Sequence, residues 1–116
     1  MKSGQPAESD WKKFRAIVPE LRERYLSARN TELVAILQGE PLTPTERFWT
    51  ASKRMEEIGD ILRACLDDHR RSGMMHSLRL MYYHQMITDE DLTGFSEEVQ
   101  ERIALGPSNR KNWQTP

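Results

Sequence analysis

Cysteine is nearly absent from this sequence, and long apolar stretches are missing. Cys65 is the only cysteine among 116 residues, so no disulfide can form within the chain. No stretch approaches the roughly 20 consecutive apolar residues that cross a bilayer. The opening residues, MKSGQPAESDW, also lack the apolar core of a signal peptide. From these absences we expect a cytoplasmic protein that has no membrane partner.

A strong net charge is missing as well. Seventeen Lys and Arg residues oppose 18 Asp and Glu residues, which leaves a net charge of −1. A charge this small points to neither a nucleic acid nor a membrane as the partner. Residues 1–54 carry ten basic and seven acidic residues, and residues 55–116 carry seven and eleven. This mild asymmetry is typical of solvated faces and of contacts between the two halves.

The sequence contains none of several motifs that carry known chemistry. We find no glycine-rich phosphate loop, no nucleophile elbow and no metalloprotease helix motif. Asp67, Asp68 and His69 are adjacent, but successive residues of a helix point about 100° apart. They therefore do not face one pocket, where paired groups would shift each other's pKa. We predict a protein that is not an enzyme and that binds no cofactor.

What the sequence does contain is helical periodicity. Asp10 is placed to cap a first helix, in which Pro19 predicts a kink or a break into two collinear helices. Asn30 or Thr31 would cap a second helix, and Gly39 would end it. The apolar face of the first segment comprises Trp11, Phe14, Ile17, Val18, Leu21, Tyr25 and Ala28.

The clearest local signal is the capping-box sequence Thr43-Pro44-Thr45-Glu46. Thr43 would be the N-cap, Pro44 would occupy the first helical position, and Glu46 would reach back to the N-cap. No proline follows before Arg71, so we predict one long helix over about residues 44–71, roughly 40 Å long. Its apolar face comprises Phe48, Ala51, Met55, Ile58, Gly59, Leu62, Cys65, Leu66 and His69.

Three shorter helices are predicted after a break at Ser72-Gly73. Residues 74–86 form a helix whose apolar side chains go almost all the way round. Thr88 opens a short helical turn, and Ser96 caps a last helix. Gly94 ends the first of these, and Gly106 ends the second.

These elements predict an all-α fold, an antiparallel bundle of about four to six helices around the long central helix over residues 44–71. We predict a single helical domain over residues 10–106. A flexible N-terminal arm over residues 1–9 would precede it, and a disordered tail over residues 107–116 would follow.

Cys65 and His69 are the first candidate for a metal site, because they have the i,i+4 spacing of ligands on one helix. Residues i and i+4 can reach one point beside a helix, but a structural zinc site needs four ligands and a catalytic site needs three. His76 and His84 would have to join the pair through the tertiary fold. The alternative is that Cys65 is a small buried residue and that His69 lies at the edge of the core. We predict no metal site.

Trp49 is the best candidate for an interaction anchor. It lies about 100° from Phe48 and thus off the main apolar face. The alternative is that the N-terminal arm or the first helix covers it. The methionine-rich helix over residues 74–86 is either a central core helix or a surface shared with a partner. The predicted interaction surface comprises Trp49, Met74, Met75, Leu80, Tyr83, Met86, Asp89, Glu90 and Asp91.

These features predict a non-catalytic protein–protein interaction or regulatory module that acts through helical surfaces. The partner would be another protein or a second copy of the chain, and the acidic residues 89–101 would favour a basic partner surface. The alternative is a nucleic-acid-associated protein that uses the basic first helix and a patch of Arg70, Arg71 and Arg79.

Overall fold

The computed structural model describes residues 6–104, and all regular structure in that range is helical. The prediction of an all-α fold is therefore confirmed for this part of the chain. The predicted tail over residues 107–116 and residues 1–5 of the predicted arm lie outside the described residues. The elements are α1 (Glu8–Leu37), α2 (Pro44–Leu66), the 3-10 turn η1 (Arg71–Gly73), α3 (Met74–Tyr83), α4 (Asp89–Leu92) and α5 (Glu97–Ile103).

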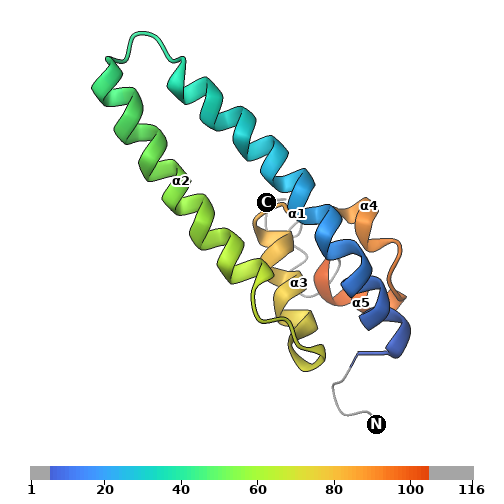
Figure 1. Cartoon of the computed structure of the whole chain (residues 1–116). Coiled ribbons are helices and arrows are strands. Elements are labelled where there is room, and N and C mark those ends of the chain that lie inside the picture. The colour runs from blue at the N-terminus through green and yellow to red at the C-terminus, as the bar shows by residue number, and fades with distance from the viewer. Residues whose placement is uncertain (1–5, 105–116) are drawn as a thin grey trace, which may run out of the picture.

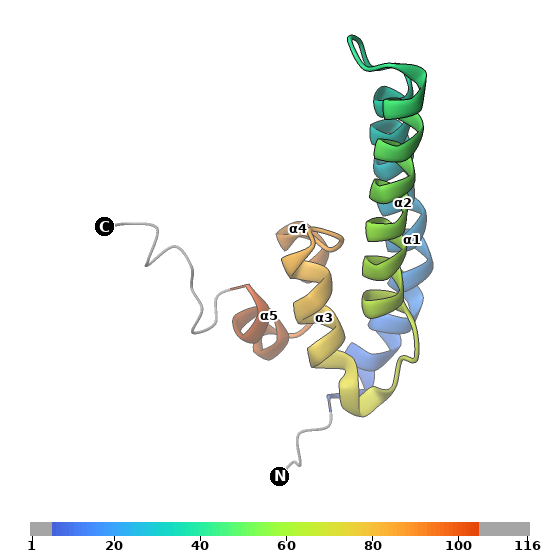
Figure 2. The same ribbon diagram turned by 90° about the vertical axis from the view of Figure 1, so that its left-hand side faces the viewer.

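Helices α1 and α2 form one long antiparallel hairpin, joined by the loop of residues 38–43 (Figure 1). Helices α3, α4 and α5 gather at the end of the hairpin away from this loop, and they all lie on one side of it (Figure 2). The structure therefore does not confirm the predicted bundle around a central helix 44–71, since α2 ends at Leu66 and packs along α1. The longest helix is α1, with 30 residues, whereas α2 has 23.

Helix α1 is continuous through Pro19 and through Asn30 and Thr31, where we predicted interruptions. Pro19 is exposed, so water can hydrogen-bond the carbonyl group that the proline leaves without a donor. Thr31 caps no new helix, because its hydroxyl donates to the Ser27 carbonyl one turn earlier. Gly39 follows the C-cap residue Gln38, as predicted.

Asp10 is not the N-cap of α1, because the helix begins at Glu8 and places Asp10 inside its first turn. The Asp10 side chain instead holds the start of α5, as its carboxylate accepts hydrogen bonds from the Ser96 backbone N–H at 2.8 Å and from the Ser96 hydroxyl at 2.7 Å. Ser96 is the N-cap of α5, as predicted, and accepts from the Val99 N–H. Asp10 is 4% exposed and thus a buried link between the two helices.

The capping box at the start of α2 is confirmed. The Glu46 N–H donates to the Thr43 hydroxyl at 3.1 Å, and the Thr43 N–H donates to the Glu46 carboxylate at 2.9 Å. The same arrangement opens α4, where Thr88 and Asp91 exchange the two bonds. Both boxes satisfy backbone N–H groups that have no partner within the first helical turn.

Helix α2 ends at Leu66 and does not continue to Arg71 as predicted. Asp67 is extended and Asp68 has a φ of 61°, in the left-handed region. The carbonyl groups of the last helical turn have no donor within the helix, and the His69 ring satisfies one of them: its Nε2 donates to the Cys65 carbonyl at 2.7 Å. The chain then reverses through η1 into α3.

Helix α3 ends at Tyr83, three residues earlier than predicted. Gln85 has a φ of 61°, and the Met86 N–H donates to the Met81 carbonyl at 2.7 Å. This is the pattern of a Schellman cap, which closes a helix through one left-handed residue. As a result the chain turns at Gln85 and carries Met86 and Ile87 back into the core.

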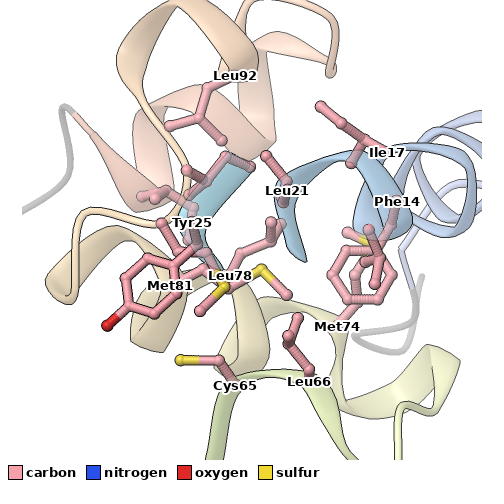
Figure 3. Close-up of a cluster of buried hydrophobic side chains, with 14 of the residues drawn as sticks. Phe14, Ile17, Leu21, Tyr25, Cys65, Leu66, Met74, Leu78, Met81 and Leu92 are labelled. Carbon is pink, nitrogen blue, oxygen red and sulfur yellow. The ribbon is translucent and has the colours of Figure 1, made fainter. Parts of the chain in front are cut away.

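The main core lies where α3–α5 meet the hairpin (Figure 3). Phe14 and Leu21 of α1 pack there against Met74, Leu78 and Met81 of α3, and all five are fully buried. Beyond this core, the end of the hairpin that carries the loop has only its own two helices to pack against (Figure 2). The rest of the core comprises Ile17, Val18, Tyr25, Leu33, Ile58, Cys65, Leu66, Met86, Ile87, Leu92, Phe95, Val99 and Ile103.

Candidate interaction surface on the helical hairpin

Exposed large apolar side chains are concentrated at the loop end of the hairpin. Val34 and Leu37 belong to α1, and Phe48, Trp49 and Met55 belong to α2; their exposed fractions lie between 49% and 63%. The sequence predicted Phe48 and Met55 on the buried face of the long helix, and the structure corrects this. Trp49 is exposed, and no described residue of the N-terminal arm or of α1 buries it.

The width of the apolar stripe explains this exposure. At the loop end, α2 turns Ala51 and Ile58 toward α1, and α1 buries Leu33 in return. One neighbouring helix covers only part of an amphipathic stripe. The flanking apolar residues Phe48 and Met55 therefore remain uncovered, because α3–α5 do not extend to this end of the hairpin (Figure 1).

The exposed apolar residues of the two helices point to the same face of the hairpin. Successive helical residues are about 100° apart, so each direction can be measured from the buried contact residue of its helix. On α1, Val34 and Leu37 lie about 100° and 40° from Leu33. On α2, Phe48 and Met55 lie about 60° and 40° from Ala51. All four angles are measured in the same direction, toward increasing residue number. Because α1 and α2 are antiparallel, rotating in this direction about either helix axis, away from the contact between the helices, leads to the same face of the hairpin. On α1 this direction lies about 180° from Leu21, which faces α3–α5.

No Lys, Arg, Asp or Glu occupies this face over several turns of either helix, although 30% of the chain is charged. Charged residues lie at the end of this face away from the loop: Glu23 is one turn before Ser27, and the Arg63 guanidinium lies 3.5 Å from the point where a Gly59 Cβ would be. We call these positions the uncharged hairpin face. It comprises Ser27, Asn30, Val34 and Leu37 of α1 and Phe48, Ser52, Met55 and Gly59 of α2.

Charged groups gather on the other side of the hairpin and join its two helices. The Arg54 Nε donates to the Glu32 carboxylate at 2.6 Å, and Arg29 and Glu57 extend the cluster with ion pairs at 3.0 and 3.3 Å. The hydrogen bond from Arg54 lowers the pKa of Glu32, and the same bond raises the pKa of Arg54. Of these pairs, Glu32–Arg54 joins α1 to α2, whereas Arg29–Glu32 and Arg54–Glu57 each lie within one helix.

Trp49 lies at the outer edge of the uncharged hairpin face, where its ring meets Phe48 edge-to-face with centroids 4.8 Å apart. This geometry is favourable for aromatic pairs. It presents two large rings side by side on one exposed surface. Tryptophan and other aromatic side chains dominate the energetic centres of protein interfaces, so this pair is the strongest anchor on the hairpin.

The structure removes part of the interaction surface that we predicted around α3. Met74 and Met86 are buried in the core, because α3 packs between the hairpin and α5. Met75 and Leu80 are half-buried and pack against the same core. Tyr83 is exposed at the end of α3 and borders a hollow that Asp89 also lines.

The acidic segment is largely committed to contacts within the chain. Asp91 accepts hydrogen bonds from Arg24 and Thr88, and Asp89 accepts one from the Tyr82 hydroxyl at 2.7 Å. Burial alone would raise the pKa of Asp91, but the bonds from Arg24 and Thr88 outweigh it and lower that pKa. Glu90 is exposed, so it alone of the three predicted acids extends freely into solvent.

Replacing Asp91 with asparagine is expected to lower the free energy of unfolding by about 1–2 kcal/mol at neutral pH. The loss is no larger because Arg24 is half exposed, and solvent weakens its ion pair with Asp91. Because the pKa of Asp91 is lower in the folded chain, its carboxylate binds a proton more readily in the unfolded chain. The stability that Asp91 contributes is therefore lost as the pH falls through its folded pKa. The difference between the two proteins should therefore shrink below about pH 4. Urea unfolding across pH, with Glu90→Gln as control, measures it; a difference independent of pH would contradict this assignment.

Cys65 and His69 are close together but are arranged as core residues. Cys65 is fully buried, and burial raises the pKa of its thiol to about 11. His69 packs edge-to-face on Phe14 and uses Nε2 to donate to a backbone carbonyl. Among residues 6–104, no group of three or more His, Cys, Asp or Glu side chains is placed to hold a metal ion.

The three arginines of the predicted basic patch are not gathered as a free surface. Arg71 donates to the Pro6 carbonyl and pairs with Glu8 at 2.8 Å, which fastens η1 to the start of α1. Arg70 pairs with Asp68 at 3.6 Å, and Arg79 is exposed on α3. In α1, Arg24 and Arg29 already engage acidic partners. The nucleic-acid alternative thus stays a prediction with fewer free cations to support it.

Comparison with known proteins yields no relative for this chain. No family model matches it, and neither a curated protein nor a solved structure matches it. Between residues 6 and 104, no helix has the length and hydropathy needed to span a membrane.

Proposed function

We propose that this protein is a non-catalytic interaction module that binds a protein partner through the uncharged hairpin face. The observation that carries the proposal is the exposure of Val34, Leu37, Phe48, Trp49 and Met55 together at one end of the hairpin. In a monomer these side chains present about 500 Å² of apolar surface, at the upper end of what monomeric proteins expose.

The division of the molecule into two parts supports this role. The main core holds α3–α5 against one end of the hairpin, and Phe14 and Leu78 are fully buried there. The other end extends beyond this core as a two-helix projection (Figure 2). A partner can therefore approach the uncharged hairpin face without displacing any element of the main core.

The chemistry of the face favours an apolar helical partner. Phe48 and Met55 are separated by two turns, with Ser52 between them, a spacing that accepts side chains from another helix. The positions of this face carry no charged residue that could pair with a charged side chain of the partner. A charged partner surface would therefore be buried without counter-ions, which is unfavourable. The cytoplasm remains the expected compartment, since Cys65 is a free buried thiol.

Site-specific photo-crosslinking in cells tests the proposal. A benzophenone side chain at position 48 should form a protein adduct, whereas the same group at position 50 should not. Thr50 is also exposed on α2, but it lies about 200° around the helix from Phe48 and points away from the uncharged hairpin face. Equal adducts from both positions, or none from position 48, would refute a binding role for this face.

A further inference from the structure

We infer that the partner seated on the uncharged hairpin face is a second copy of this chain, packed antiparallel about a twofold axis. This inference rests on the proposed function and names its partner. Each copy would contribute a hairpin, so that four helices form a bundle at the centre of the dimer. The α3–α5 cluster of each copy lies on the opposite side of its hairpin and stays outside this bundle (Figure 2).

Helix α2 carries two separate packing seams, as a helix with two neighbours in a four-helix bundle does. Ile58 lies in the seam that is buried against α1. The second seam runs through Phe48, Ser52, Met55 and Gly59, at spacings of four, three and four residues. This is the spacing by which one helix packs along another. No other helix of the described structure covers this second seam, and the Arg63 guanidinium lies over its Gly59 end.

Large and small residues alternate along the second seam, and this alternation selects the orientation of the partner. A twofold axis midway between residues 53 and 54 places Phe48 opposite the partner's Gly59 and Ser52 opposite the partner's Met55. Every large side chain then meets a small one, which is how facing core positions fill space. A parallel pairing in register would instead place Phe48 on Phe48 and Gly59 on Gly59.

The same axis suits α1. An axis at the level of residue 32 places Leu37 opposite the partner's Ser27, again large against small, and places Val34 opposite the partner's Asn30, which is of similar size. Residue 32 lies at the same level of the hairpin as residue 54, because Glu32 and Arg54 are hydrogen-bonded across it at 2.6 Å. Two independent helix sequences therefore point to one axis.

The dimer also reaches the size that a specific interface needs. Covering the exposed apolar side chains of both copies removes about 1,000 Å² from water, near the lower limit for a specific interface. Arg63 lies over Gly59 and would meet the ring of the partner's Phe48, a favourable cation–π arrangement. We expect a weak, reversible dimer with a dissociation constant on the order of 1–100 μM, because interfaces near this lower size limit are typical of transient association.

Sedimentation velocity of the full chain over a concentration series tests the inference. The wild-type protein should change from monomer to dimer across the micromolar range. Phe48→Lys should raise the dissociation constant by about 100-fold or more, because a charge would be buried without a partner. Thr50→Lys, on the opposite face of α2, should leave it unchanged. A wild-type chain that stays monomeric up to about 1 mM overturns the inference.

Gly59→Leu tests the antiparallel pairing itself. A Cβ at this position meets only the flexible end of Arg63, at 3.5 Å or more, and Arg63 can move aside for the rest of the side chain, so we expect the monomer to accommodate leucine and the helix to gain propensity. The variant should therefore unfold at a higher denaturant concentration and yet dimerise about 10-fold or more weakly. A Gly59→Leu chain that dimerises as well as the wild type overturns the pairing.

The crosslinking experiment separates the two proposals. An adduct from position 48 with twice the mass of the chain supports self-association. A position-48 adduct of another mass, from a chain that is monomeric in solution, overturns self-association and leaves the interaction role standing. Absence of any adduct together with a monomer overturns both.

Discussion

Replacing Phe14 with alanine should lower the free energy of unfolding by about 3–5 kcal/mol, because it opens a cavity in the main core. The Phe14 side chain is fully buried between Trp11, which stacks on it at 5.6 Å, and His69, which meets it edge-on at 4.8 Å. A loss of this size is a large fraction of the stability of a small domain. Urea unfolding followed by far-UV circular dichroism measures it.

The matched control is the same substitution at Phe48, which is 57% exposed. Phe48→Ala should change the stability of the monomer by less than about 0.5 kcal/mol, when measured at a concentration below that of any self-association. The contrast would show that the main core, and not the loop end of the hairpin, determines whether the chain folds. Similar losses from both substitutions would mean that Phe48 is buried in solution.

Replacing Asp10 with alanine should lower the free energy of unfolding by about 2–3 kcal/mol. The substitution removes the acceptor for two donors of Ser96 at the start of α5, and both lie within 2.8 Å of the carboxylate in the native structure. It also removes a negative charge from the N-terminal end of a helix, where such a charge is favourable. Amide exchange of Val99 and Ile103 should become faster.

Glu23→Ala is the control for Asp10, since Glu23 is an exposed acid on the same helix. It should change stability by less than about 0.5 kcal/mol. Asp10→Asn should fall between the two, because an amide keeps one oxygen acceptor for Ser96 but loses the charge. If Asp10→Ala behaved like Glu23→Ala, the bond to Ser96 would contribute nothing to the fold in solution.

Local chemistry in the sequence was sufficient to locate most helix starts. Thr43, Thr88 and Ser96 were each predicted as N-caps and each is one. These signals are reliable because a cap satisfies backbone N–H groups a few residues away and needs no tertiary partner. Asp10 has the same sequence signature, but its carboxylate contacts a residue 86 positions later. No local pattern distinguishes these two uses of an aspartate.

The candidate surface was predictable only in part. Trp49 was recognised because it falls off the apolar face of its helix, a property of spacing alone. Phe48 and Met55 were assigned to the buried side, and Met74 and Met86 to the surface, and the structure reverses both assignments. Periodicity identifies which residues share a face, but it does not report whether a neighbouring helix covers that face.

The sequence by itself determined that the chain is helical, where most helices start, and that Trp49 lies off its apolar stripe, because these depend on residues within one or two turns of each other. Only the tertiary structure decided that α1 continues through Pro19, that α3–α5 pack at one end of the hairpin, and that the other end is left uncovered. The physical reason is that burial depends on which segments meet in space. Leu33 is buried and its neighbour Val34 is exposed only because α2 lies along one side of α1 and nothing described lies along the other.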